Sequence, residues 1–138
     1  MAVALTKINS FIENLAEGAI NLGGAGITVA LTNTAHTATW DELADLTQVS
    51  YTYCSSRVVT VTSSAQTSGV YKLVLQDLTL TATGGSVGAF RYVYLYDDNS
   101  TGDKLIGYYD YGSAITLADG ESILLDFDAD NGVLTLGS

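Results

Sequence analysis

Apolar residues near the start of the chain recur at helical spacing. They fall three or four positions apart and so lie on one helical face: Ile8, Phe11, Ile12, Leu15 and Ala19. Ser10 and Glu13 fit a capping box, and Gly18 is a suitable C-terminal stop. The pattern predicts one short N-terminal helix, which must dock on another element because so few turns are unstable alone.

After Asn21 the chain adopts the patterning of strands. We predict strands at 27–32, 57–62, 90–97 and 104–111, with a short helical turn at 39–45. Between residues 70 and 82 the apolar alternation changes phase at Gln76 and Asp77. This phase change indicates a bulge, or a corner at which the chain passes from one sheet to another.

Turn sequences indicate how the strands are connected. The segment 98–102 predicts a hairpin between 90–97 and 104–111, and the pairs Asp119-Gly120 and Asn131-Gly132 predict two more. About nine short strands at this spacing are typical of an antiparallel β-sandwich with jelly-roll-like features. We therefore expect a mainly β single domain over residues 1–138, with an arm and helix in 1–22 and the sandwich in 23–138.

Charge and composition exclude several classes of function. Fifteen Asp and Glu face five Lys and Arg, and the net charge of −10 would repel the phosphates of nucleic acids. The chain has no uninterrupted apolar stretch of the roughly 18 residues that a membrane span takes. One Cys and one His leave no cysteine-based zinc site and no multi-histidine cluster, so we expect no cofactor. Met1–Leu5 is too short for the apolar part of a signal peptide, which favours folding in the cytoplasm.

Two segments invite a chemical interpretation. Gly84–Gly88, with Ser86 at its centre, matches a nucleophile elbow, but a strand-like run follows where that motif needs a helix. His36 lies in a polar loop, where we expect it to be solvated, and we predict that the chain is not an enzyme. Asp126, Asp128 and Asp130 resemble half of a calcium loop, and two interpretations stay open: a cation site or the solvated edge of a hairpin.

Tyrosines are the most distinctive feature of the second half. Tyr92, Tyr94 and Tyr96 share one face of their predicted strand, whereas Tyr108 and Tyr109 point to opposite faces of the next. Tyrosine is enriched at protein interfaces, and aromatic faces also stack on sugars. Protein contact, filling of the core and surface, and sugar stacking are therefore three alternatives for these rings.

Several segments together resemble a family of small tailed-bacteriophage virion proteins. The first half matches in Lys7–Gly18, Asn21–Gly23, Val29–Ala35 and Leu43–Thr47, and the second in Arg91–Asp98 and Leu105–Gly112. The family usually has a proline near the end of the Asn-Thr-Ala segment, where this chain has His36. These motifs are structural rather than catalytic, and the resemblance spans most of the chain.

The resemblance implies a capsid decoration, or cement, protein. Its expected partners are the major capsid protein and further copies of itself, as a homotrimer, on the capsid surface of a virion made in the bacterial host cytoplasm. The alternative is a tail- or fibre-associated adhesin that binds host glycans. We expect the protein contacts to come from the apolar N-terminal segment and one tyrosine face: Met1, Ala2, Val3, Leu5, Tyr92, Tyr94, Tyr96, Tyr109 and Tyr111.

Overall fold

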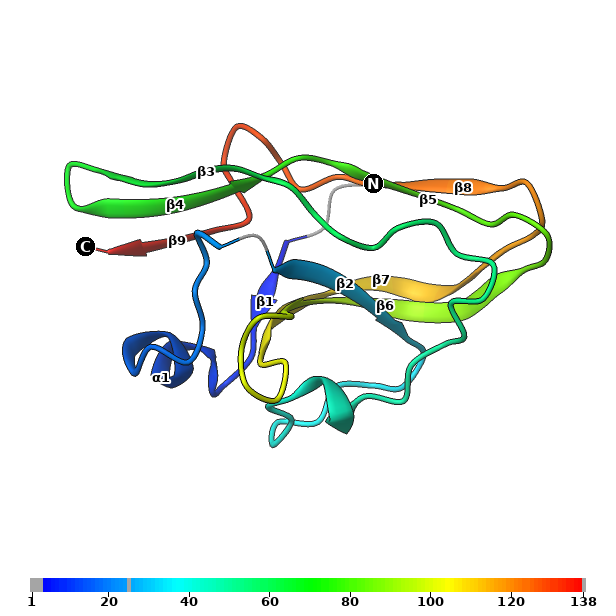
Figure 1. Ribbon diagram of the computed structural model, residues 1–138, viewed down its shortest axis with the longest axis horizontal. Helices are drawn as coiled ribbons and strands as arrows, with labels where there is room; N and C mark the ends of the chain where they lie inside the picture. The colour runs from blue at the N-terminus through cyan, green and yellow to red at the C-terminus, as the bar shows by residue number, and fades with distance from the viewer. Residues whose placement is uncertain (1–3, 25, 138) are drawn as a thin grey trace.

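The strands lie in two layers, as Figure 1 shows for the computed structural model, which describes residues 4–24 and 26–137. One layer is an antiparallel four-stranded sheet in the order β1-β7-β6-β2. The other layer holds a three-stranded sheet, β3-β4-β9, and a two-stranded sheet, β5-β8. The elements are β1 (Thr6–Lys7), α1 (Phe11–Ala16), β2 (Ile27–Thr32), η1 (Leu43–Asp45), β3 (Val61–Thr67), β4 (Val70–Leu75), β5 (Leu78–Thr81), β6 (Val87–Asp97), β7 (Leu105–Leu117), β8 (Ser122–Leu125) and β9 (Leu134–Gly137).

This architecture confirms the predicted fold class. The chain is mainly β with antiparallel sheets, and the described residues contain one short α-helix, near the N-terminus. The core lies between the layers, where Leu73 and Leu75 of β4 are buried together with Val93 and Leu95 of β6. Every residue of β2 is buried as well, so this strand has no solvated face.

The helix is shorter than its apolar pattern indicates. Ser10 occupies the N-cap position but makes no cap hydrogen bond, because its Oγ donates to Asp41 Oδ1 at 2.6 Å. Gly18 does end the helix, with a φ of 78° and its N–H bonded to the Leu15 carbonyl. Within the described residues, no helix has the length and apolar character needed to cross a membrane.

The phase change at Gln76 and Asp77 is a corner between sheets, which is one of the two predicted alternatives. Before it, β4 pairs with β3 and β9; after it, β5 pairs with β8. The predicted hairpin of β6 and β7 is also confirmed, with Tyr94 opposite Tyr108 and Val93 opposite Tyr109.

The two other predicted hairpins are wrong. Asp119-Gly120 and Asn131-Gly132 do form turns, and both glycines have positive φ. The strands they join lie in different sheets, however, since β7 pairs with β6, β8 with β5 and β9 with β4. The turn chemistry was identified correctly, but each turn carries the chain from one sheet to another.

The strand predicted at 57–62 is also displaced. Residues 57–59 run along the outer edge of β2, where Val29 N–H bonds to the Arg57 carbonyl and Val59 N–H to the Ile27 carbonyl. The chain then crosses to the other layer, and β3 begins at Val61. The helical turn expected at 39–45 is present as the short η1.

Candidate functional site

An apolar groove separates α1 from the three-stranded sheet. In Figure 1 this sheet extends past the four-stranded sheet, with α1 beneath β9 at the same end of the molecule. The groove has a volume of about 540 Å³, and its lining includes Leu15, Ile20 and Leu22 on one side and Tyr71 and Leu136 on the other. Leu15, Tyr71 and Leu136 are only half-buried, so apolar surface remains open to a partner.

Strand pairing explains why Tyr71 and Leu136 line the groove together. They are direct neighbours in the pairing of β4 with β9, and buried Leu73 and Leu134 form the next pair but one. Side chains two positions apart on a strand share a face, so these four point to the same side of the sheet. The sheet therefore continues its core-facing apolar surface beyond the core and into the groove.

The polar groups of the groove are already bonded within the chain. The hydroxyls of Ser64 and Tyr71 share a hydrogen bond of 2.7 Å. Asn21 Oδ1 accepts from the Gly23 N–H at 3.0 Å, and Asp97 Oδ2 accepts from the Asn21 N–H at 2.9 Å. Asp97, which is buried at the end of β6, thus holds the segment that forms the floor of the groove.

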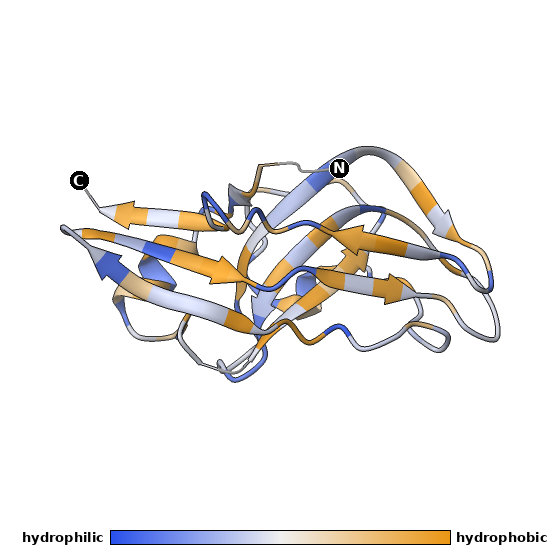
Figure 2. Ribbon diagram, turned by 90° about the horizontal axis from the view of Figure 1, so that it is seen from above, coloured by the Kyte–Doolittle hydropathy of each residue, from blue (hydrophilic) through white to orange (hydrophobic). Residues whose placement is uncertain are grey.

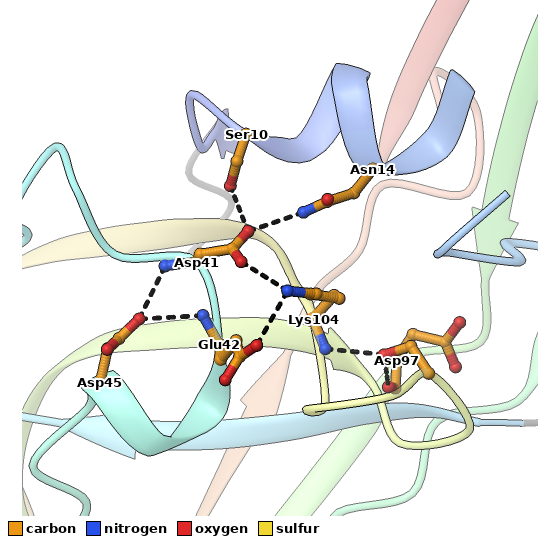
Figure 3. Close-up of polar contacts among 8 residues, drawn as sticks. Ser10, Asn14, Asp41, Glu42, Asp45, Asp97 and Lys104 are labelled. Carbon is orange, nitrogen blue, oxygen red and sulfur yellow. Dashed lines mark hydrogen bonds and ion pairs between the residues drawn. The ribbon is translucent and has the colours of Figure 1, made fainter. Parts of the chain in front are cut away.

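A polar network fixes α1 as the groove wall, as the close-up in Figure 3 shows. Asp41 Oδ1 accepts from Ser10 Oγ at 2.6 Å and from Asn14 Nδ2 at 2.7 Å, and both donors belong to the start of the helix region. Lys104 Nζ donates to Asp41 Oδ2 at 2.6 Å and to Glu42 Oε1 at 2.9 Å. The helix, the 41–45 loop and the β6–β7 turn are therefore joined through one lysine.

The charges of this network stabilise one another. The hydrogen bond from Lys104 is the largest influence that holds the pKa of the Asp41 carboxyl below its ordinary value. The backbone N–H groups of Asp41 and Glu42 lower the pKa of Asp45 in the same way, by bonding to its Oδ2. Paired carboxylates of this kind support the shape of a site rather than proton transfer at neutral pH.

His36 belongs to an aromatic cluster, contrary to the expectation that it is solvated. Its ring stacks on Tyr108 with centroids 4.6 Å apart and meets Trp40 edge-on at 5.6 Å. Its Nδ1 lies 2.8 Å from the hydroxyl of fully buried Tyr94. Burial lowers the pKa of His36 and raises that of Tyr94, so both side chains are neutral at pH 7.

The structure corrects the expected tyrosine contact face. Tyr92, Tyr94, Tyr96 and Tyr109 are all buried, with at most 7% of each residue exposed. Both faces of the β6–β7 hairpin are covered, one by the His36 cluster and the other by the opposite layer, where Phe127 packs against Tyr109. These four rings are therefore core residues of this chain, and only half-buried Tyr111 keeps accessible area.

Most of the N-terminal contact candidates lie outside the residues that the structure describes. Met1, Ala2 and Val3 fall outside the described residues. Leu5 is half-buried and packs against the core, and it lines a second recess together with Tyr109, Phe127 and Val133. In the described chain Leu5 therefore contributes to packing.

The remaining candidates, Asp126, Asp128, Asp130 and Ser86, lie in turns and beside a strand rather than in a site equipped for chemistry. The described residues contain no group of three or more His, Cys, Asp or Glu side chains placed to hold a metal ion, and this includes Asp126, Asp128 and Asp130. Asp126 Oδ1 instead accepts from the Asp128 N–H, and Asp128 bonds Asn131. Ser86 is followed directly by β6, where a nucleophile elbow would begin a helix.

Sequence reasoning missed the groove and the Lys104 network. Leu15 was recognised as apolar, but the residue facing it across the groove, Leu136, lies 121 positions later. Asp41 and Lys104 are likewise far apart in the chain, and no local pattern joins them. Comparison of the chain with protein-family models, curated proteins and solved structures found no match.

Proposed function

We propose that this protein is a structural component of a bacteriophage virion that binds the outer surface of the assembled capsid and stabilises it. The observation that carries the proposal is the open apolar groove between α1 and the β3-β4-β9 sheet. A half-exposed apolar recess on a rigid scaffold is typical of a surface that another protein covers. The resemblance to virion proteins supports the choice of partner, the major capsid protein.

The groove suits an apolar anchor from the shell. Leu15 and Leu136 offer aliphatic walls, while the hydroxyl of Tyr71 is held by Ser64 and leaves the ring edge free for contact. Anchors of this kind carry most of the free energy of an interface when they are fully desolvated. A protein that binds the assembled shell but not free subunits stabilises the shell by its binding free energy, and about 2 kcal/mol per copy is enough to measure.

Heating of purified particles tests this proposal. Decorated shells should release DNA at a higher temperature than bare shells, and Leu136→Gln should remove most of that difference. The matched control is Leu124→Gln on β8, because Leu124 is 52% exposed and lies outside the groove. Equal release temperatures for bare and decorated shells would refute the cement role. Full protection by Leu136→Gln would refute the groove as the contact.

One observation favours the glycan-binding alternative. His36, Trp40 and Tyr108 are half-buried neighbours on the loop-covered face of the four-stranded sheet. Aromatic faces of this kind can stack on sugar rings. Trp40 is the only tryptophan in the chain, so a change in tryptophan fluorescence reports a ligand that binds beside this ring. A saturable change on adding host-surface glycans, abolished by Tyr108→Ala, would favour an adhesin over a cement protein.

A further inference from the structure

The outer edge of β3 is an open, uncharged template for strand pairing. The strand pairs with β4 on one side only, and it ends one side of the three-stranded sheet. Residues 62–67 are exposed, and Figure 2 shows β3 pale along most of its length, beside the more hydrophobic β4. Edge strands normally carry charges or prolines that block pairing with another chain. This edge carries neither.

All of β3 lies within an uncharged stretch of the chain. No charged residue lies between Arg57 and Lys72, although the whole chain has a net charge of −10. Two copies that approach by their acidic surfaces are held apart, because like charges repel. Two copies that approach by β3 bring together Ser, Thr, Ala and Gln side chains.

The register of the hairpin shows which backbone groups point outward. Ser68 and Gly69 both have positive φ, as in a type I′ turn, so Thr67 and Val70 form the hydrogen-bonded pair that closes the hairpin. Pairs then alternate along the ladder, and the N–H and C=O groups of Ser64 and Gln66 face away from β4. These groups are available to a strand added alongside.

We propose that two copies of this chain associate by antiparallel pairing of their β3 strands. In a two-fold arrangement Ser64 of one copy bonds to Gln66 of the other, and Ala65 faces its own counterpart across the axis. A two-fold contact uses the same patch on both copies, which this uniform neutral edge allows. Ala65 suits the axis because side chains approach closest in a non-hydrogen-bonded pair. The result is a continuous six-stranded sheet made from two three-stranded sheets.

The contact is small and therefore weak in dilute solution. One strand pair buries much less than the roughly 1,200–2,000 Å² of stable interfaces. Copies held side by side on a surface are at high effective concentration, where such a contact becomes populated. Pairing through β3 needs no capsid, so purified protein tests it separately from capsid binding.

Sedimentation of the purified chain over a wide concentration range tests the pairing. The wild type should pass from monomer to dimer as concentration rises. Ser64→Pro removes an outward N–H, and Ala65→Lys places two positive charges on the axis; each should weaken dimerisation at least tenfold. The controls are Ala65→Thr, which adds no charge, and Thr135→Pro, which blocks the free edge of β9 instead. Circular dichroism and melting temperature confirm that each variant is folded.

Three results would overturn the proposal. The first is a monomer at every concentration up to about 1 mM, which corresponds to a free energy of association no better than about −4 kcal/mol. The second is a dimer that both folded β3 variants leave unchanged. The third is a trimer sensitive to Thr135→Pro, which would mean that β3 of one copy pairs with β9 of the next in a three-membered ring.

Discussion

At the scale of single residues, His36 is the clearest case of a side chain whose role depends on distant partners. Its neighbours in the chain are polar, yet its ring is packed between Trp40 and Tyr108. Its Nδ1 is also the hydrogen-bond partner of the Tyr94 hydroxyl, which is buried in the core. The ring therefore closes one face of the sheet and satisfies a buried polar group at the same time.

We predict that stability falls as His36 is protonated. Burial lowers the pKa of the folded state below the unfolded value of 6.5. As the pH falls, the unfolded chain therefore binds the proton before the folded chain does. The contribution of neutral His36 to the free energy of unfolding is complete above pH 6.5 and declines as the pH falls toward the pKa of the folded state. Histidine titrates between about pH 5 and 8, so thermal melts over this range should show the melting temperature falling as the pH falls.

His36→Phe is the control for this pH dependence. Phenylalanine keeps an aromatic ring but cannot titrate, so the slope near pH 6 should disappear. The Tyr94 hydroxyl then loses its partner, and stability at pH 7.5 should drop by about 1–3 kcal/mol. An unchanged slope in this variant would assign the pH dependence to other groups.

At the scale of elements, the position of α1 depends on one half-buried charge cluster. The helix has six residues, too few to be stable by itself. Ser10 and Asn14 bind Asp41, and Asp41 is held by Lys104 of the β6–β7 turn. Packing of Phe11 in the core supplies the apolar part of the attachment.

Lys104→Met should therefore destabilise the fold by about 1 kcal/mol, because it leaves the half-exposed carboxylates of Asp41 and Glu42 without their cation. The difference from wild type should begin to shrink below about pH 4, where the carboxyls of the unfolded chain become protonated, and should shrink further as the pH falls toward the lowered pKa of Asp41 in the fold. Urea unfolding at pH 7 and pH 3.5 measures both effects. The matched control is Lys7→Met on the exposed strand β1, which should change stability little. Equal effects of the two substitutions would mean that the Lys104 cluster contributes nothing specific.

At the scale of the whole molecule, acidic charge opposes self-association. A net charge of −10 acts between copies through solvent, whereas the proposed β3 contact is itself neutral. Salt screens the long-range repulsion, with a Debye length of about 10 Å at 0.1 M, but has little effect on neutral hydrogen bonds. The two contributions can therefore be separated by ionic strength.

Raising NaCl from about 20 mM to about 300 mM should tighten dimerisation several-fold, because the Debye length falls well below the distance between the acidic surfaces. Sedimentation equilibrium at each salt concentration measures the change. Sodium sulfate at equal ionic strength is the control for specific ion effects. Dimerisation that weakens with salt would mean that ion pairs, rather than a neutral edge, hold the copies together.

The sequence by itself determined the local elements of this protein. The helical spacing around Phe11, the phase change at Gln76 and the hairpin of residues 90–111 all depend on neighbouring residues, and the structure confirms each one. The existence of turns at Gly120 and Gly132 was also predictable, since positive φ is a local demand that glycine meets.

Only the tertiary structure decided which strands pair and which side chains stay exposed. Alternation shows that Tyr92, Tyr94 and Tyr96 share a face, but it cannot show that both faces of that hairpin are covered. The groove likewise exists only because the fold brings Leu15 and Leu136 to its two walls. The edge of β3 is exposed because β3 pairs with β4 on one side and is the last strand of its sheet. Long-range contacts follow from how two layers close around a common core, and this closure is a property of the whole chain rather than of any segment.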